Sequence, residues 1–508
     1  MKTTKKLLLK YTARTIILSI AAIITIGSSC KRPQDIQDTI LNDQGSYFYT
    51  DFSGLPEDKK PLPIGVFDSG TGGLAVLNDI VEYEHFENGD GERVFENESF
   101  IYLADMANMP YGSYALEDNT EMLQEHIIKN VQFLLDRKYY RNAEDPEYMT
   151  DKSSVKAIVI ACNTATAYGQ ELIEEFLEKA GLDIIVKGVI DAATTAAVSY
   201  MEPDEDGSIA VMATDGTVRS GAYVQSIIEK KAELGRHGDI DIFQQAGIGI
   251  AEAVDENNDF IDRGASQPRE GYMGPSETGE GVLEIDMSIW DRYHFNMEDG
   301  AILYEGDAGN PYNIQLNSVE NYVAFHVVSL MEQVRTGEGT SPLKSIILGC
   351  THYPYVDDVF VDILDKLRNY EENGEYVYRP HMEEEITLVN PAVKVALQLY
   401  ESLGERELLA ENNYLDSEFY IAVPNLLNPN VETREDGSFT YEYKYGRTAG
   451  EIQEYVKRTP FNRQAIPDDI LERLEVQIPS VYEMMVYFNR HNPKTGYLED
   501  EHLIVPLR

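Results

Sequence analysis

From residue 63 onward, short apolar runs that end in polar residues alternate with amphipathic segments. Strand-length runs occur at 64–67 (IGVF), 100–104 (FIYLA) and 157–161 (AIVIA). Residues 120–138 (TEMLQEHIIKNVQFLLDRK) carry apolar side chains three and four positions apart, which predicts an amphipathic helix. This alternation predicts a parallel sheet covered by helices on both faces.

The same alternation begins again near residue 205. Further strand-length runs occur at 208–213 (SIAVMA), 239–247 (DIDIFQQAG) and 345–350 (SIILGC), and residues 319–335 have helical spacing. We therefore predict an α/β fold with two doubly wound parallel-sheet domains that face each other across a cleft. The first would span residues 62–195, joined by about 386–403, and the second residues 196–385.

Two long segments fall outside this alternation. Residues 255–315 hold the only tryptophan, Trp290, among many glycines and acids, and such a long irregular stretch predicts an added subdomain or a lid. Residues 404–508 form a C-terminal extension with both strand-like and helical patterns, which could fold as a small appended domain.

The N-terminus has the pattern of an export signal. Basic residues precede an apolar stretch from Ile16 to Ile26, and small residues follow up to Cys30. That stretch is shorter than the roughly 20 residues of a membrane-spanning helix. We predict a signal peptide over residues 1–29, lipidation of Cys30, and a polar tether over residues 30–61. The chain would then be a membrane-anchored lipoprotein of the cell envelope of a Gram-negative-type bacterium, facing the periplasm or in the outer membrane. Ordinary secretion or a retained anchor are the alternatives.

Charge narrows the choice of partners. The 508 residues carry a net charge of −46, so the phosphates of a nucleic acid would repel the chain, and no nucleic-acid partner is expected. The 43% hydrophobic content is enough for a sizeable core.

Polar clusters follow the predicted strands at the edge where parallel sheets bind ligands. They are Asp68-Ser69, Pro110-Tyr111-Gly112, Cys162-Asn163-Thr164, Thr214 to Ser220, and Cys350-Thr351-His352. Two facing domains would bring a cysteine to each wall of one cleft. Each cysteine leads into a predicted helix, whose free N–H groups favour an anion.

A pair of thiols with anion-binding amides suits proton transfer at a carbon next to a carboxylate. One thiolate would remove the Cα proton, and the opposite thiol would deliver a proton to the other face. Asp68 is the candidate to assist Cys162, and His352 the candidate to assist Cys350.

Other interpretations of the same residues remain open. Either cysteine alone could be a small core residue, and His352 a structural histidine. The run DSGTGG at 68–73 could bind phosphate, although it lacks the P-loop lysine. Cys162, Cys350 and His352 could ligate a metal, but their spacing matches no zinc pattern, so no metal is expected.

Five segments, in order, resemble the signature segments of bacterial glutamate racemases. They are GVFDSGTGGLAVL, YLADMANMPYGS, VIACNTATA, MATDGTVRSGAY and ILGCTHYP, and with the inserts set aside they span about residues 62–400. The Thr-His-Tyr-Pro after Cys350 resembles the glutamate type, whereas aspartate racemases typically have Thr-Glu there.

The resemblance implies an activity and assigns roles. It implies an isomerase that interconverts L- and D-glutamate without a cofactor, with a small acidic amino acid as its partner and a homodimer as a possible assembly. It implies Cys162 and Cys350 as acid/base residues. The substrate contacts that it implies are Asp68, Ser69, Tyr111, Gly112, Asn163, Thr164, Thr351 and His352.

The export signal, the insert and the C-terminal extension depart from the family pattern. Glutamate racemases supply D-glutamate for peptidoglycan of the cell wall from the cytoplasm, which an exported enzyme could not do directly. Two alternatives therefore stay open: a non-catalytic solute-binding or cell-envelope lipoprotein that retains the racemase fold, and a racemase for aspartate or another acidic amino acid.

Overall fold

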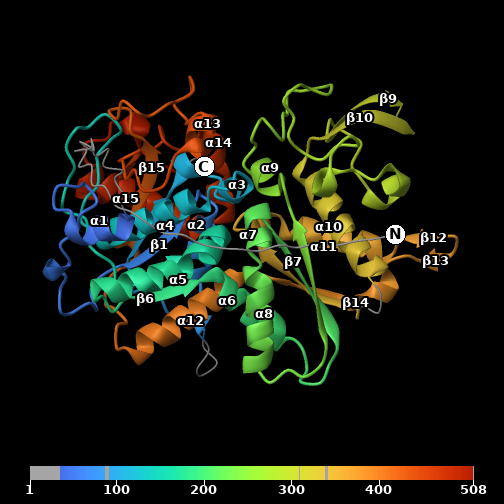
Figure 1. Ribbon diagram of the computed structural model, residues 1–508, viewed down its shortest axis with the longest axis horizontal. Coiled ribbons are helices and arrows are strands. Elements are labelled where there is room, and N and C mark those ends of the chain that lie inside the picture. Colours follow the sequence, from blue (N-terminus) through green and yellow to red (C-terminus); the bar gives the residue numbers. More distant parts are fainter. Residues whose placement is uncertain (1–34, 86–90, 308, 338–340, 507–508) are drawn as a thin grey trace, which may run out of the picture.

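Two sheets, each at the centre of its own domain, organise the molecule (Figure 1). The computed structural model describes residues 35–85, 91–307, 309–337 and 341–506. The first sheet has the order β16-β15-β4-β1-β5-β6, and the second has the order β14-β11-β7-β8. All neighbouring strands in both sheets are parallel except β16, which is antiparallel to β15. The predicted α/β fold with two parallel-sheet domains is confirmed.

The strands and helices have these bounds. The sheet strands are β1 (Ile64–Asp68), β4 (Phe100–Ala104), β5 (Ala157–Ile160), β6 (Ile185–Gly188), β7 (Gly207–Ala213), β8 (Ile240–Ala246), β11 (Leu343–Gly349), β14 (Met382–Val389), β15 (Glu418–Pro424) and β16 (Val456–Pro460). Three short hairpins pair β2 (Glu84–His85) with β3 (Glu92–Arg93), β9 (Ile302–Asp307) with β10 (Asn310–Leu316), and β12 (Glu371–Glu372) with β13 (Glu375–Tyr376). The helices are α1 (Ile36–Asn42), α2 (Gly73–Val81), α3 (Gly112–Leu116), α4 (Thr120–Leu135), α5 (Asn163–Ala180), α6 (Val189–Ser199), α7 (Asp215–Ser220), α8 (Ala222–Glu233), α9 (Ile250–Val254), α10 (Val319–Thr336), α11 (Asp357–Arg368), α12 (Pro391–Glu405), α13 (Tyr441–Gly446), α14 (Asp468–Gln477) and α15 (Pro479–His491). Short 3-10 turns lie at Phe52–Gly54, Met106–Asn108, Gly281–Leu283, Met287–Tyr293, Tyr353–Val356, Arg379–His381, Tyr414–Asp416, Pro493–Thr495 and Asp500–His502.

Both faces of the first sheet are covered, as its continuous apolar strands require. Helices α2, α12, α14 and α15 pack on one face, and α1, α4 and α5 pack on the other. In the second domain α10 and α11 cover one face, while α8 and one side of α6 cover the other. Helix α6 thus contributes to the cores of both domains and joins them.

The C-terminal extension does not form a domain of its own. Strand β15 pairs with β4, β16 pairs with β15, and α14 and α15 bury their apolar side chains in the first domain. The prediction of an appended domain is therefore wrong. The chain also returns to the first domain later than the predicted residue 386. Strand β14 still belongs to the second sheet, and of the segment 386–403 only α12 packs on the first domain.

The predicted tether is also largely folded. Ile36, Ile40 and Phe48 are buried in the first domain, and Lys138 Nζ donates to the carbonyls of Tyr47 and Tyr49. Residues 36–50 therefore pack on the domain, because apolar side chains scattered among polar ones still find a partner surface. The predicted signal peptide and Cys30 lie outside the described residues. Within the residues that the structure describes, none of the helices combines the length and hydrophobicity needed to cross a bilayer.

The insert at 255–315 is part of the second domain rather than a lid. Phe260, Ile285, Tyr293 and Ile314 pack with α10 in one core. Only the first residues of the insert, Asp255 and Asn257, line the cavity described next. The insert therefore adds to the core of the second domain.

Candidate active site

The carboxyl ends of strands from both sheets converge on one cavity of about 120 Å³. Helices α3, α7 and α9 lie where the two domains meet in Figure 1, and residues at their ends line it. The first domain supplies Ser69, Tyr111, Gly112, Cys162, Asn163 and Thr164, and the second supplies Thr214, Glu252, Asp255, Cys350, Thr351 and His352, among others. Of the residues predicted for catalysis and substrate contact, all but Asp68 line this cavity.

Cys162 ends β5 and caps α5. Its Sγ accepts the N–H of Ala165 at 3.5 Å, and its thiol donates to Ser69 Oγ at 3.8 Å. Burial raises the pKa of the Cys162 thiol, and the negative charge of Asp68 raises it further. Cys162 is therefore held as a thiol, the form that can deliver a proton.

Cys350 has a different neighbour. His352 Nδ1 lies 3.7 Å from Cys350 Sγ, and His352 Nε2 lies 2.9 Å from Asp255 Oδ2. Burial alone would lower the pKa of His352, but Asp255 and Cys350 together raise it well above its usual value. The imidazole therefore carries a proton within reach of Cys350 Sγ. The two cysteines are both buried and unbonded to each other, in contrasting electrostatic surroundings.

Asp68 lies behind the cavity wall. Its Oδ2 accepts the N–H groups of Gly73 at 2.8 Å and Gly70 at 3.3 Å, which fixes the turn into α2. Its Oδ1 is buried with no hydrogen-bond partner among the described residues. Burial raises the pKa of Asp68, although the nearby His352 opposes this. Direct contact of Asp68 with a substrate stays a prediction.

Hydroxyl and amide groups at two helix starts join the domains. Thr164 Oγ1, at the start of α5, lies 3.0 Å from Thr214 Oγ1 and 3.1 Å from Thr217 Oγ1 at the start of α7. The Tyr223 hydroxyl donates to Asn163 Oδ1, again across the two domains. The cavity thus has helix N-termini from both domains, whose free N–H groups attract a carboxylate.

The hydroxyl of Tyr111 is engaged within the first domain. The hydroxyl donates to Asp105 Oδ2 at 2.5 Å and accepts from Asn130 Nδ2 at 2.8 Å. Because this buried network occupies it, the predicted contact by Tyr111 would be made by the ring or the backbone.

The sequence alone did not identify Glu252, Asp255 or Arg473 as site residues. Asp255 begins the irregular insert, and acidic residues are too common in this chain to stand out. Arg473 lies in the extension, and its Nη2 donates to Asp255 Oδ1 at 2.9 Å. No pattern in the sequence pairs residues so far apart.

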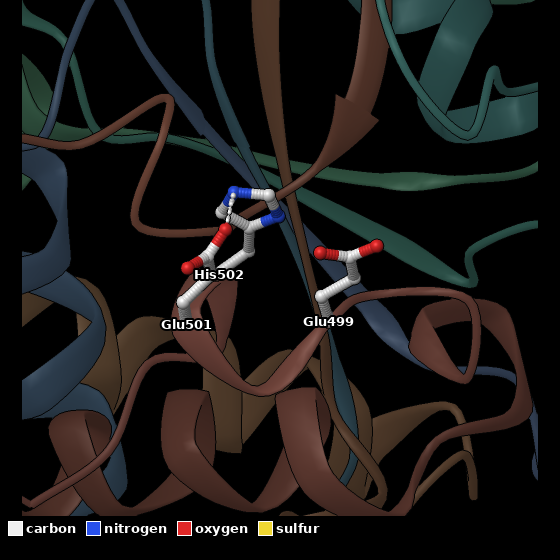
Figure 2. A group of neighbouring side chains, drawn as sticks. All are labelled: Glu499, Glu501 and His502. Atoms are coloured by element: carbon white, nitrogen blue, oxygen red, sulfur yellow. Dashed lines mark ion pairs between the residues drawn. The ribbon is translucent and has the colours of Figure 1, made fainter.

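Figure 2 shows Glu499, Glu501 and His502, which among the described residues are close enough to hold a metal ion. Both glutamates are exposed, and His502 Nε2 already lies 2.9 Å from Gln464 Nε2. None of the three lines the cavity. Exposed acidic groups of this kind are common without an ion, so the trio gives no reason to expect a metal in the chemistry.

No protein-family model matches the chain. It is 30% identical over 198 residues to the glutamate racemase of Lactobacillus acidophilus, covering 39% of this chain and 57% of that protein. It is 32% identical over 199 residues to the glutamate racemase of Deinococcus radiodurans, covering 39% of this chain and 51% of that protein. The chain thus spans about half the length of these curated relatives.

Among solved structures, the glutamate racemase of Francisella tularensis in complex with D-glutamate matches with a TM-score of 0.40 and 19% identity, covering 76% of this chain and 95% of that one. A TM-score this low does not establish a shared fold, so the fold rests on the strand order described above. Both of the relatives named above are glutamate racemases. Over about 200 residues the chain is therefore similar in sequence to bacterial glutamate racemases.

Proposed function

We propose that the protein is a cofactor-independent amino-acid racemase that interconverts L- and D-glutamate. The observation that carries this proposal is the pair of buried free cysteines, one from each domain, that line a single cavity. Binding alone would need no such pair. The glutamate racemase homologues support glutamate as the substrate.

The contrasting surroundings of the two thiols suggest their order of action. A thiolate at Cys350, next to the protonated His352, removes the Cα proton. The thiol of Cys162 delivers its own proton to the opposite face of the resulting carbanion. Cys350 is then a thiol and Cys162 a thiolate. The enzyme in this protonation state acts on the other enantiomer.

The carbanion is the difficult species, because a thiol is a far stronger acid than the Cα–H group. Preorganised hydrogen-bond donors lower the energy of developing charge in a site that excludes water. The N-termini of α5 and α7, with the hydroxyls of Thr164 and Thr214, are the donors available for a substrate carboxylate.

Incubation of the purified protein with L-glutamate in D₂O tests the proposal. We expect D-glutamate to form with solvent deuterium at Cα, because the proton delivered by a thiol has exchanged with solvent. Exchange with aspartate but not with glutamate would correct the substrate. Measurable binding without Cα exchange on either enantiomer of glutamate or aspartate would contradict the proposal and support a solute-binding lipoprotein.

Close contact between the domains near the cysteines leads to a further prediction, for Gly72→Ala. A Cβ at Gly72 would lie 2.5 Å from Thr351 Oγ1 and 2.8 Å from His352 Cε1. The backbone angles of Gly72 suit alanine, so the clash must be relieved by displacing the side chains of Thr351 and His352 or the domain that carries them. We expect kcat/KM to fall by up to about a hundredfold, since small misplacements of reacting groups have effects of that size.

Steady-state racemisation measures this effect, with Gly404→Ala in α12 as the control. A Cβ at Gly404 would meet no atom within 4 Å, so that variant should keep full activity. Equal activities for the two variants would mean that the contact at Gly72 does not set the geometry of the site.

We also propose that the protein is exported and anchored by a lipid on Cys30. The basic and apolar segments before Cys30 support this. Metabolic labelling with a radioactive fatty acid should mark the wild-type protein and not the Cys30→Ala variant. Equal labelling of both, or labelling of neither, would contradict the anchor.

A further inference from the structure

Arg473 reaches from the C-terminal extension to the second domain. It lies in α14, whose side chains Ile470, Leu471 and Leu474 are buried in the core of the first domain. The backbone that carries Arg473 is therefore fixed to the first domain, on the opposite side of the cleft from Cys350 and His352.

The guanidinium group of Arg473 contacts the second domain at three points. Its Nη1 donates to the carbonyl of Val254, and its Nη2 donates to Asp255 Oδ1 at 2.9 Å. Its central carbon lies 5.7 Å from the ring centroid of Tyr355, which follows His352 in the chain and packs against the first-domain core. Arg473 and Tyr355 thus extend in opposite directions across the same boundary.

Asp255 links this contact to the chemistry. One carboxylate oxygen accepts from Arg473, and the other lies 2.9 Å from His352 Nε2. Burial would raise the pKa of Asp255, but His352 and then Arg473 lower it to about 2, so the carboxylate stays charged. Two donors on two different oxygens fix both the position and the rotation of this carboxylate.

A surface ion pair of this kind would contribute little. Here, however, the side chains of Arg473 and Asp255 are only 18% and 12% exposed. The His352 side chain is 6% exposed, and its Nδ1 faces Cys350 Sγ. Because these groups are shielded from water, loss of the arginine would free the carboxylate to rotate away from the imidazole.

We propose that Arg473 is a positioning residue for the Cys350 side of the reaction. By holding Asp255, it keeps His352 in place beside Cys350 and holds the two domains together at that wall. The C-terminal extension thereby completes the site. The kinetic consequences of this inference rest on the proposed racemase function. The structural claim, that Arg473 holds Asp255 in place, does not depend on that function.

The test compares full-length Arg473→Met and Arg473→Lys with the wild type. Arg463→Ala is the matched control, because Arg463 lies in the same extension and pairs with the exposed Asp468. Hydrogen exchange of the backbone amides of residues 250–257 reports on the contact itself. Primary isotope effects, measured with Cα-deuterated L- and D-glutamate, report on each direction of the reaction.

We expect faster exchange at 250–257 in Arg473→Met than in Arg463→Ala. We expect kcat to fall about tenfold or more, the size of a lost charge-assisted hydrogen bond, with partial recovery in Arg473→Lys. The isotope effect should rise for one enantiomer only, the one whose proton Cys350 removes. A merely structural role would affect both directions alike.

Unchanged exchange at 250–257 in both variants would overturn the inference, whatever the activity. Equal changes in the isotope effect for the two enantiomers in Arg473→Lys, each relative to the wild type, would overturn its kinetic part, even if Arg473→Met does not fold. If the wild-type protein itself does not racemise glutamate, the proposed function fails, and the exchange measurement alone decides whether Arg473 holds Asp255.

Discussion

Replacing either Cys162 or Cys350 with alanine is expected to abolish racemisation, with kcat lowered by about a hundredfold to ten-thousandfold, the range for loss of a general acid or base. Each variant keeps one thiol in the cavity. That thiol can still remove a proton from one face, exchange it with solvent and return it to the same face. In D₂O, each variant should therefore exchange the Cα proton of one enantiomer with retention, and the two variants should act on opposite enantiomers.

Nuclear magnetic resonance of the substrate Cα proton measures this exchange directly. Cys162→Ser and Cys350→Ser serve as matched variants, because serine keeps the size of the side chain and can still cap α5 at position 162. They should lose racemisation as well, since a hydroxyl is a much weaker acid than a thiol. Full racemisation by any single variant would refute the assignment of two bases.

The second large effect is expected for Asp255→Asn, which removes the charged partner of both His352 and Arg473. Breaking a buried ion pair by removing one partner costs about 3–5 kcal/mol, and here the pair is slightly exposed. We therefore expect the free energy of unfolding at pH 7 to fall by about 3 kcal/mol. Racemisation should fall as well, because His352 would lose the group that holds it charged beside Cys350.

The dependence on pH distinguishes this pair from a general loss of stability. The pKa of Asp255 is about 2 in the folded protein, against about 3.9 in an unfolded chain. Its stabilisation is thus complete above about pH 4 and is lost as the pH falls through about 2. For His352, whose folded pKa is raised, stabilisation is complete below the unfolded value of about 6.5 and is lost as the pH rises through the raised value.

Chemical denaturation between pH 3 and pH 7 should therefore show the wild type losing its advantage over Asp255→Asn on the acidic side. Asp468→Asn is the control, because its partner Arg463 forms an exposed ion pair. That control should change stability by less than about 1 kcal/mol. A pH-independent difference between wild type and Asp255→Asn would mean that the carboxylate charge is not the source of the stability.

Local sequence patterns were sufficient for the core of the fold. The apolar runs at 64–67, 100–104 and 157–161 are too continuous for a sheet with one face in water, so they predicted buried parallel strands. Polar residues directly after such strands predicted the edge where a site forms. For that reason both cysteines, together with Asn163, Thr164 and His352, could be assigned to one site from the order of residues along the chain.

The tertiary structure alone decided which distant segments pair. The run at 418–424 has the pattern of a strand, but nothing in it identifies β4 as its neighbour. Likewise, the sequence around Ile40 does not indicate that this segment packs on the first domain. Hydrophobic periodicity reports whether a residue is buried, whereas the partner depends on how the whole chain closes.

The sequence did not predict the charged partners of His352, because their pairing also depends on tertiary contacts. Asp255 and Arg473 are unremarkable charged residues in a chain of net charge −46. Their roles arise only because α14 is packed on one domain and α9 ends on the other, which brings two charges together beside His352. The sequence alone was sufficient to place the two cysteines at the site, since each directly follows a predicted strand. Contacts between the domains decided which charged groups, Asp255 and Arg473, lie next to His352 on the Cys350 side of the cavity.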